Sequence, residues 1–84
     1  MYEILFSSAA IRDHKKLPRE VLKSINVAIE TLKGSPRPIG CKKLTNRDAY
    51  RIRVADYRII YEIHDKTVTV LVIRIRHRRE VYLD

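Results

Sequence analysis

The sequence is poor in the features that mark secreted and membrane proteins. Its single cysteine, Cys41, excludes an internal disulfide and is typical of a reducing compartment. No apolar run approaches the roughly 18 residues that a membrane-spanning helix needs. The opening residues, MYEILFSS, lack the basic segment and long apolar run of a secretory signal. We therefore expect a cytoplasmic protein with no membrane partner.

Signs of a cofactor are equally scarce. There is no glycine-rich phosphate loop, and the three histidines and Cys41 lack the spacing of metal ligands. At 84 residues the chain is short enough for one domain, residues 1–84, with a small core. We therefore expect no cofactor and no metal.

Acidic residues are outnumbered, with ten Asp and Glu against eighteen Lys and Arg, which gives a net charge of +8. Such a balance favours a densely negative partner, either a nucleic acid or a strongly acidic protein. The alternative is a basic surface that serves only solubility.

The order of apolar and turn residues predicts a small α+β domain with the element order β-α-α-β-β-β. A strand over MYEILFS precedes a short helix over residues 9–16, which Ser7 or Ser8 can cap. A second helix over residues 19–33 has apolar residues on one face, and a loop over residues 34–48 follows. Strands near 49–54, 57–64 and 67–76 then form an antiparallel meander, with both helices packed on one face of the sheet.

Alternation along the strands places arginines together. Tyr50, Ile52 and Val54 share one face of their strand, so Arg51 and Arg53 share the other. In the next strand Tyr57, Ile59, Tyr61 and Ile63 share a face, which leaves Arg58 opposite. In the last strand Val68, Val70 and Val72 are in phase with Arg74, Arg76 and Arg78, so we expect all six on one side unless a bulge intervenes. The sequence thus predicts an arginine-lined, helix-free face that binds phosphate groups, and the alternative is a solvated face with scattered charge.

Four stretches carry a resemblance to a known family. YRIRVADYRIIYEI and the following VTVLVIRIRHRREVY resemble the RelE/ParE superfamily of bacterial and archaeal toxins, and LPREV and PRPIGCKKL fit the same family. The resemblance covers essentially the whole chain. It implies the toxin of a type II toxin–antitoxin system, held inactive by a small antitoxin with an acidic toxin-binding segment. It also implies operator DNA as a partner only through the antitoxin complex.

The RelE branch of this superfamily implies a ribosome-dependent endoribonuclease that cuts mRNA in the A site. Carried over by position, Arg51 and Arg53 match basic strand residues, Arg58 matches a phosphate-binding arginine, and Arg78 and Tyr82 match the C-terminal arginine and tyrosine. We expect these five to be catalytic. Lys42, Lys43, Arg76 and His77 are expected to contact RNA, although the two lysines are equally consistent with a solvated surface. Ala55 and Arg76 depart from the family pattern, because glycine is common at both positions.

Cleavage by this route uses the 2′-hydroxyl as nucleophile and needs a base. Arg51 and Arg53 cannot serve, because a guanidinium keeps its proton at neutral pH. Tyr82 and His77 remain as alternatives, and Tyr82 is favoured because His77 points away from Arg78 on an ideal strand. Tyr82 can also act by stacking on a base without proton transfer.

Two other functions stay open. One is a toxin of the same fold that lacks nuclease activity and inhibits DNA gyrase, as the ParE branch does. The other is a basic nucleic-acid-binding module without catalysis. Arg58, Arg78 and Tyr82 together favour the ribonuclease.

Overall fold

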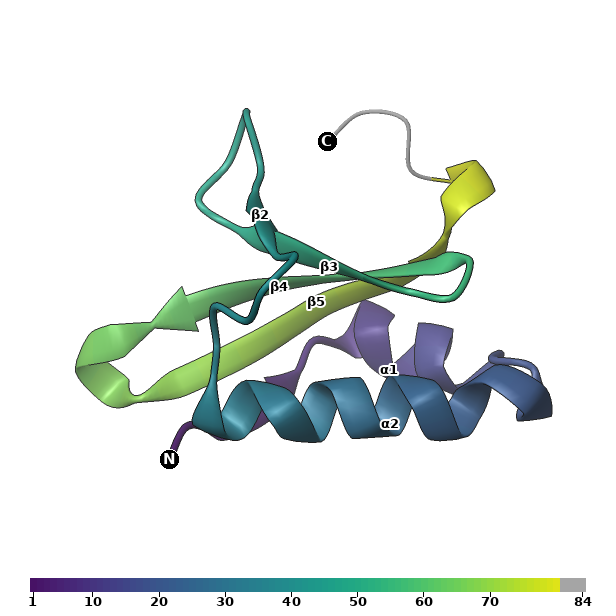
Figure 1. The fold of residues 1–84 in the computed structure, drawn as a ribbon, viewed down its shortest axis with the longest axis horizontal. Coiled ribbons are helices and arrows are strands. Elements are labelled where there is room, and N and C mark those ends of the chain that lie inside the picture. The colour runs from purple at the N-terminus through teal and green to yellow at the C-terminus, as the bar shows by residue number, and fades with distance from the viewer. Residues whose placement is uncertain (81–84) are drawn as a thin grey trace.

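The computed structural model describes residues 1–80, and these form two helices packed against one face of a five-stranded sheet (Figure 1). In chain order the elements are β1 (Glu3–Phe6), α1 (Ser8–Lys15), α2 (Arg19–Gly34), β2 (Lys42–Lys43), β3 (Tyr50–Val54), β4 (Tyr57–His64) and β5 (Thr69–His77). Single 3₁₀ turns lie at Asp65–Thr67 and Arg78–Glu80. The α+β class, both helices and the β3–β4–β5 meander are confirmed.

The sheet order β1-β5-β4-β3-β2 adds two features to the predicted fold. β1 pairs in parallel with β5, from Glu3 opposite Thr69 to Phe6 opposite Val72, so the sheet is mixed. β2 is an additional short strand inside the predicted loop, and it pairs antiparallel with β3. Its two residues carry no strand pattern of their own, because lysine is not a strand-forming residue and only the neighbouring β3 orders them.

Helix α1 begins where Ser7 accepts a hydrogen bond from the Ala10 amide at 3.0 Å, so Ser7 rather than Ser8 is the cap. The apolar stripe of α2, formed by Val21, Ile25, Ile29 and Leu32, is buried against the sheet. Its partners in the core are Ile52, Ile59, Tyr61, Val70, Val72 and Ile75. Neither helix of residues 1–80 is long and apolar enough to cross a membrane.

A β-bulge interrupts the pairing of β4 with β5. Tyr61 pairs with Val72, but its neighbour Ile60 pairs with Arg74, so β5 has one extra residue at this point. The extra residue reverses the alternation of side chains beyond it. The prediction that the valines and arginines of this strand share one side is therefore wrong. Val70 and Val72 lie in the helix-side core, as does Ile75 beyond the bulge, so the register assigns Arg76 to the opposite face.

The face away from the helices is not bare along its whole length. Leu44 and Ala49 are buried against Ile60, and Ile73 packs against the same cluster. The segment that joins β2 to β3 rises from this side of the sheet in Figure 1. The prediction of an uncovered face is therefore too broad, because an apolar pair in the middle of that face, Ile60 and Ile73, needs a cover. This cover leaves the arginines at the end near the β3–β4 turn.

Candidate nucleic-acid interface

Three arginines form a row across the sheet at the end near the β3–β4 turn. Arg53 of β3 lies directly opposite Arg58 of β4, which in turn lies opposite Arg76 of β5. Directly paired residues share a face, and like charges in such positions destabilise a sheet. The bulge brings Arg76 into this row, which we call the arginine row. Negative charge, from a carboxylate such as that of Glu80 or from a bound anion, offsets this cost.

Next to the arginine row lies a second, less continuous row. Lys42 pairs with Arg51, and Arg51 pairs with the buried Ile60. Lys42 is exposed and Arg51 half-buried, so both extend the positive charge along the same face. Lys43 is one position further along β2, where the register turns it to the opposite face. It forms a 3.5 Å ion pair with Asp48. Of the two predicted lysines, only Lys42 joins the arginines.

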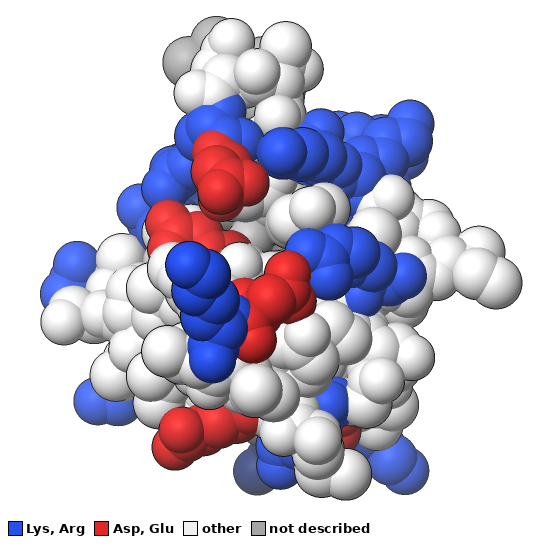
Figure 2. All heavy atoms as spheres, turned by 90° about the vertical axis from the view of Figure 1, so that its left-hand side faces the viewer, with Lys and Arg blue, Asp and Glu red and all other residues white. Residues whose placement is uncertain are grey.

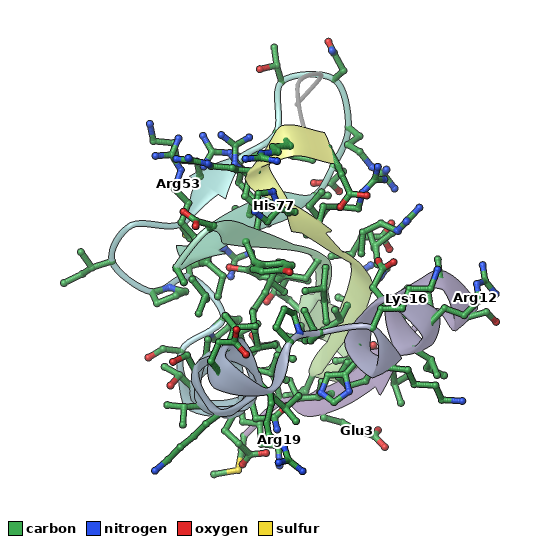
Figure 3. The ribbon with its side chains drawn as sticks, turned by 90° about the vertical axis from the view of Figure 1, so that its right-hand side faces the viewer. Glu3, Arg12, Lys16, Arg19, Arg53 and His77 are labelled. Carbon is green, nitrogen blue, oxygen red and sulfur yellow. The ribbon has the colours of Figure 1, made fainter. Side chains whose placement is uncertain are left out.

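A pocket of about 310 Å³ lies beside the arginine row and is called here the arginine pocket. Its walls are Arg53, Ala55, Asp56, Tyr57, Arg58 and Arg78. Three guanidinium groups and one carboxylate thus line it. In Figure 3, Arg53 lies among crowded nitrogen-tipped side chains, far from Arg12 and Arg19 of the helix layer. The fork of a guanidinium matches phosphate oxygens, so this pocket is suited to a phosphodiester.

Arg78 is held at the pocket by the β3–β4 turn. Its amide donates a 2.7 Å hydrogen bond to the carbonyl oxygen of Asp56. Its Nη1 lies 3.8 Å from Oδ1 of the same residue. The side chains of Arg78 and Asp56 are both about two-thirds exposed, at 66% and 64%. The backbone hydrogen bond therefore fixes the main chain of Arg78, while its guanidinium stays accessible to a ligand.

Arg76 belongs to the arginine row but does not line the pocket. Its Nη2 donates to the Glu80 carbonyl at 3.3 Å, and its buried Nε lies 4.0 Å from Glu80 Oε1 without a hydrogen-bond partner in the described chain. The side chain is 29% exposed. Arg76 therefore contributes charge from behind the site, and Glu80 holds it in place.

His77 lies on the other side of the sheet. It pairs with Tyr57, and the two rings meet edge to face at 5.2 Å. His77 lines an adjoining pocket of about 320 Å³, which shares Asp56 and Tyr57 with the arginine pocket and reaches Val21 near the start of α2. Its Nδ1 accepts a 3.2 Å hydrogen bond from the Arg79 amide. The structure thus does not bring His77 into the arginine pocket. Tyr82, the other predicted base, lies outside the described residues.

Arg74 takes a structural position that the sequence did not reveal. Asp13 of α1 accepts hydrogen bonds from Arg74 Nε at 2.8 Å and from the Ile75 amide at 2.9 Å. Burial raises the pKa of Asp13, but these hydrogen bonds outweigh it and hold that pKa below its ordinary value. Asp13 thus closes the edge of β5 just beyond the last residue that β1 covers. No local signal marks a pair that is 61 residues apart.

At the opposite end of the sheet another arginine is fully engaged. Arg37 Nη2 lies 3.0 Å from Asp65 Oδ2, and its Nε donates to the Tyr50 hydroxyl at 3.3 Å. The Tyr2 hydroxyl donates to Asp65 Oδ1 at 2.7 Å. The hydrogen bond from Arg37 lowers the pKa of Asp65. We call these four residues the Arg37 network. Figure 2 shows this end of the molecule, where basic and acidic side chains alternate.

Asp56 lines the pocket but was not among the predicted site residues. The signal was present, because VADYR places one acid between the arginines of two paired strands. Across residues 1–80, no three His, Cys, Asp or Glu side chains are arranged to hold a metal ion.

Comparison with known proteins places this geometry in context. A family model described as "ParE toxin of type II toxin-antitoxin system, parDE" matches residues 4–82. Toxin RelG of Mycobacterium tuberculosis is 33% identical, over 96% of this chain and 95% of its own length. The mRNA interferase toxin RelE of Escherichia coli is 31% identical, over 96% of this chain and 90% of its own. The crystal structure of the M. tuberculosis toxin–antitoxin complex RelBE2 matches with a TM-score of 0.81 at 30% identity, covering 92% of this chain and 98% of that one.

Proposed function

Because this chain belongs to the RelE/ParE superfamily of type II toxins, we propose that it is an mRNA interferase that cleaves messages on the ribosome. The observation that carries the proposal is the arginine pocket, where Arg53, Arg58 and Arg78 line one space beside the arginine row. A relative of comparable length that is named an mRNA interferase supports the same activity.

The arginines suit the charge that develops during cleavage. When the 2′-hydroxyl attacks the neighbouring phosphate, negative charge gathers on the phosphoryl oxygens. Preorganised guanidinium groups stabilise that charge, and one such donor is typically worth about 3–4 kcal/mol of barrier. Arg58 and Arg78 take this role in the pocket, and Arg53, which pairs with Arg58, lines the same space. Arg51 and Lys42 extend the track for the flanking RNA backbone.

The same charges define the partners. An acidic antitoxin segment neutralises the toxin by covering the arginine pocket or by displacing the segment that carries Tyr82. Solved relatives include RelE bound to RelB in E. coli and in Methanococcus jannaschii, which supports an antitoxin partner here. Operator DNA is contacted through the antitoxin complex, and the ribosome and mRNA are the targets in the cytoplasm.

Primer extension on a translated message tests this proposal. Adding the protein to a translating system is expected to create new 5′ ends inside codons, and omitting ribosomes is expected to abolish them. A control with the Arg58→Ala and Arg78→Ala double variant is expected to leave the message intact. Uncut messages with the wild-type protein would contradict the proposal.

Gyrase inhibition is the second candidate, because the matching family model bears the ParE description. The same induction experiment separates the two. Intact messages together with broken DNA and blocked supercoiling would favour gyrase as the target.

A further inference from the structure

The proposed cleavage still needs a group that removes the proton of the 2′-hydroxyl. Arg51 and Arg53 keep their protons at neutral pH and cannot do so. His77 is not among the residues that line the arginine pocket, its pairing with Tyr57 puts it on the other face of the sheet, and its Nδ1 already accepts the Arg79 amide hydrogen. A neutral imidazole in that state carries its proton on Nε2, so neither ring nitrogen is available as a base.

Asp56 is placed where such a base is needed. Among the described residues that line the arginine pocket it is the one carboxylate, and it shares this lining with Arg53, Arg58 and Arg78. The 2.7 Å bond from the Arg78 amide to its carbonyl oxygen fixes the turn that carries it. Its side chain is 64% exposed and therefore accessible to RNA. At 3.8 Å from Arg78 Nη1, Oδ1 lies beyond hydrogen-bonding distance of that group.

The geometry points to Asp56 as the general base of the cleavage step, an inference that rests on the proposed function. Oδ1 or Oδ2 takes the proton of the 2′-hydroxyl while the 2′-oxygen forms its bond to phosphorus. The phosphorus–O5′ bond then breaks, and the 5′-oxygen takes a proton from solvent. Asp56 returns its proton to solvent. The products are a 2′,3′-cyclic phosphate and a 5′-hydroxyl, with no net change in protons.

The neighbouring arginines bring the substrate close to this carboxylate. They bind the phosphate whose neighbour Asp56 deprotonates, so base and phosphate site are held in one small space. The pocket of about 310 Å³ is at the lower end of the range for ligand sites, about 300–1,000 Å³. A base in so small a space is within reach of the hydroxyl next to a bound phosphate.

Single-turnover cleavage of a ribosome-bound message by Asp56→Asn tests the assignment. The variant keeps the shape of the side chain and removes the base, so the rate is expected to fall by about 10²–10⁴-fold. Ribosome affinity is expected to stay equal or to rise slightly, because a negative charge near the phosphates is lost. Glu30→Gln makes the same charge change on α2, far from the pocket, where Glu30 pairs with Lys33. It is expected to cleave at the wild-type rate.

The pH dependence separates a base from a residue that only positions Arg78. The wild-type rate is expected to rise tenfold per pH unit on its acid side, and Asp56→Asn is expected to lose that ionisation. Asp56→Glu is expected to keep it with a reduced rate. If Asp56 only positions Arg78, then Asp56→Asn should cost nothing further in an Arg78→Ala background, and that result would overturn the assignment.

The wild-type protein distinguishes failure of the proposed function from failure of the Asp56 assignment. If the wild type cleaves no translated message, the proposed function itself fails. If the wild type cleaves and Asp56→Asn cleaves equally fast or faster, only the assignment fails. A urea titration checks that Asp56→Asn folds, and Asp56→Glu provides the test if it does not.

Discussion

The arginines at the two ends of the sheet have different charged neighbours. In the Arg37 network, one guanidinium is matched by the Asp65 carboxylate and by the Tyr50 hydroxyl. In the arginine pocket, the described lining includes Arg53, Arg58 and Arg78 together with the Asp56 carboxylate. The first end balances its charges within the chain. At the second end, the described residues that line the pocket include more arginines than carboxylates, which suits a negatively charged ligand.

This contrast shows that the net charge of a protein does not reveal where its partner binds. A charge of +8 indicates a negative partner but not where it binds. The row of directly opposed arginines indicates a candidate place, since like charges in that arrangement oppose folding. The following predictions test whether the two ends differ in function as they differ in charge balance.

The largest difference is expected between Arg78→Ala and Arg37→Ala. Removing Arg78 is expected to lower single-turnover cleavage by about 10²–10³-fold, because a preorganised phosphate donor is lost. Removing Arg37 is expected to leave cleavage unchanged and to lower the thermal unfolding midpoint, because Asp65 loses its partner. Equal effects of the two variants on cleavage would remove the distinction between the ends.

Asp13, which lies between the two ends, is expected to govern stability at low pH. The hydrogen bonds from Arg74 and Ile75 lower its pKa, so their contribution is fully present above the unfolded value of about 3.9 and is lost as pH falls through the folded pKa. Asp13→Asn is expected to cost about 2 kcal/mol at pH 7. Urea titrations should show this gap narrowing as the pH falls below the unfolded value of about 3.9. A gap that stays constant with pH would contradict the role of the charge.

Arg53 provides a finer comparison through salt dependence. If its guanidinium contacts one phosphate, Arg53→Ala is expected to reduce the slope of log affinity against log salt by about 0.7. Arg37→Ala is expected to leave the slope unchanged, because that charge is already paired. Binding of a single-stranded RNA between 50 and 200 mM salt measures both slopes. The reverse pattern would place the RNA at the Arg37 end.

The smallest expected effects come from the turns at the two ends. Ala55, in the β3–β4 turn, has φ of 54°, and Val68, before β5, has φ of 51°. Glycine adopts this left-handed region without the Cβ clash, so each glycine variant is expected to gain about 0.5 kcal/mol. Val68→Gly should gain more, because a β-branched residue is more strained there. Denaturant midpoints of the two variants provide the test, and a loss of stability in both would contradict it.

Much of the site could be predicted because it depends on neighbours in sequence. Arg51, Arg53 and Arg58 lie in strands joined by a two-residue turn, so alternation and a tight hairpin place them on one face. The rest could not be predicted by that rule. Asp56 was not recognised, because its place in the pocket depends on contact with Arg78. That residue follows β5 and lies far from Asp56 in the sequence.

The sequence by itself determined the two helices and the meander, because the helical and strand periods of apolar residues and the turn residues are local features of the chain. It also determined the excess of positive charge, which follows from composition alone. Tertiary structure decided which side chains meet. The bulge opposite Ile60 sends Arg76 to the arginine row, and Asp13 holds Arg74 across a separation of 61 residues. Such choices depend on the packing of β5 between β1, β4 and α1, where one inserted residue reverses every side chain beyond it.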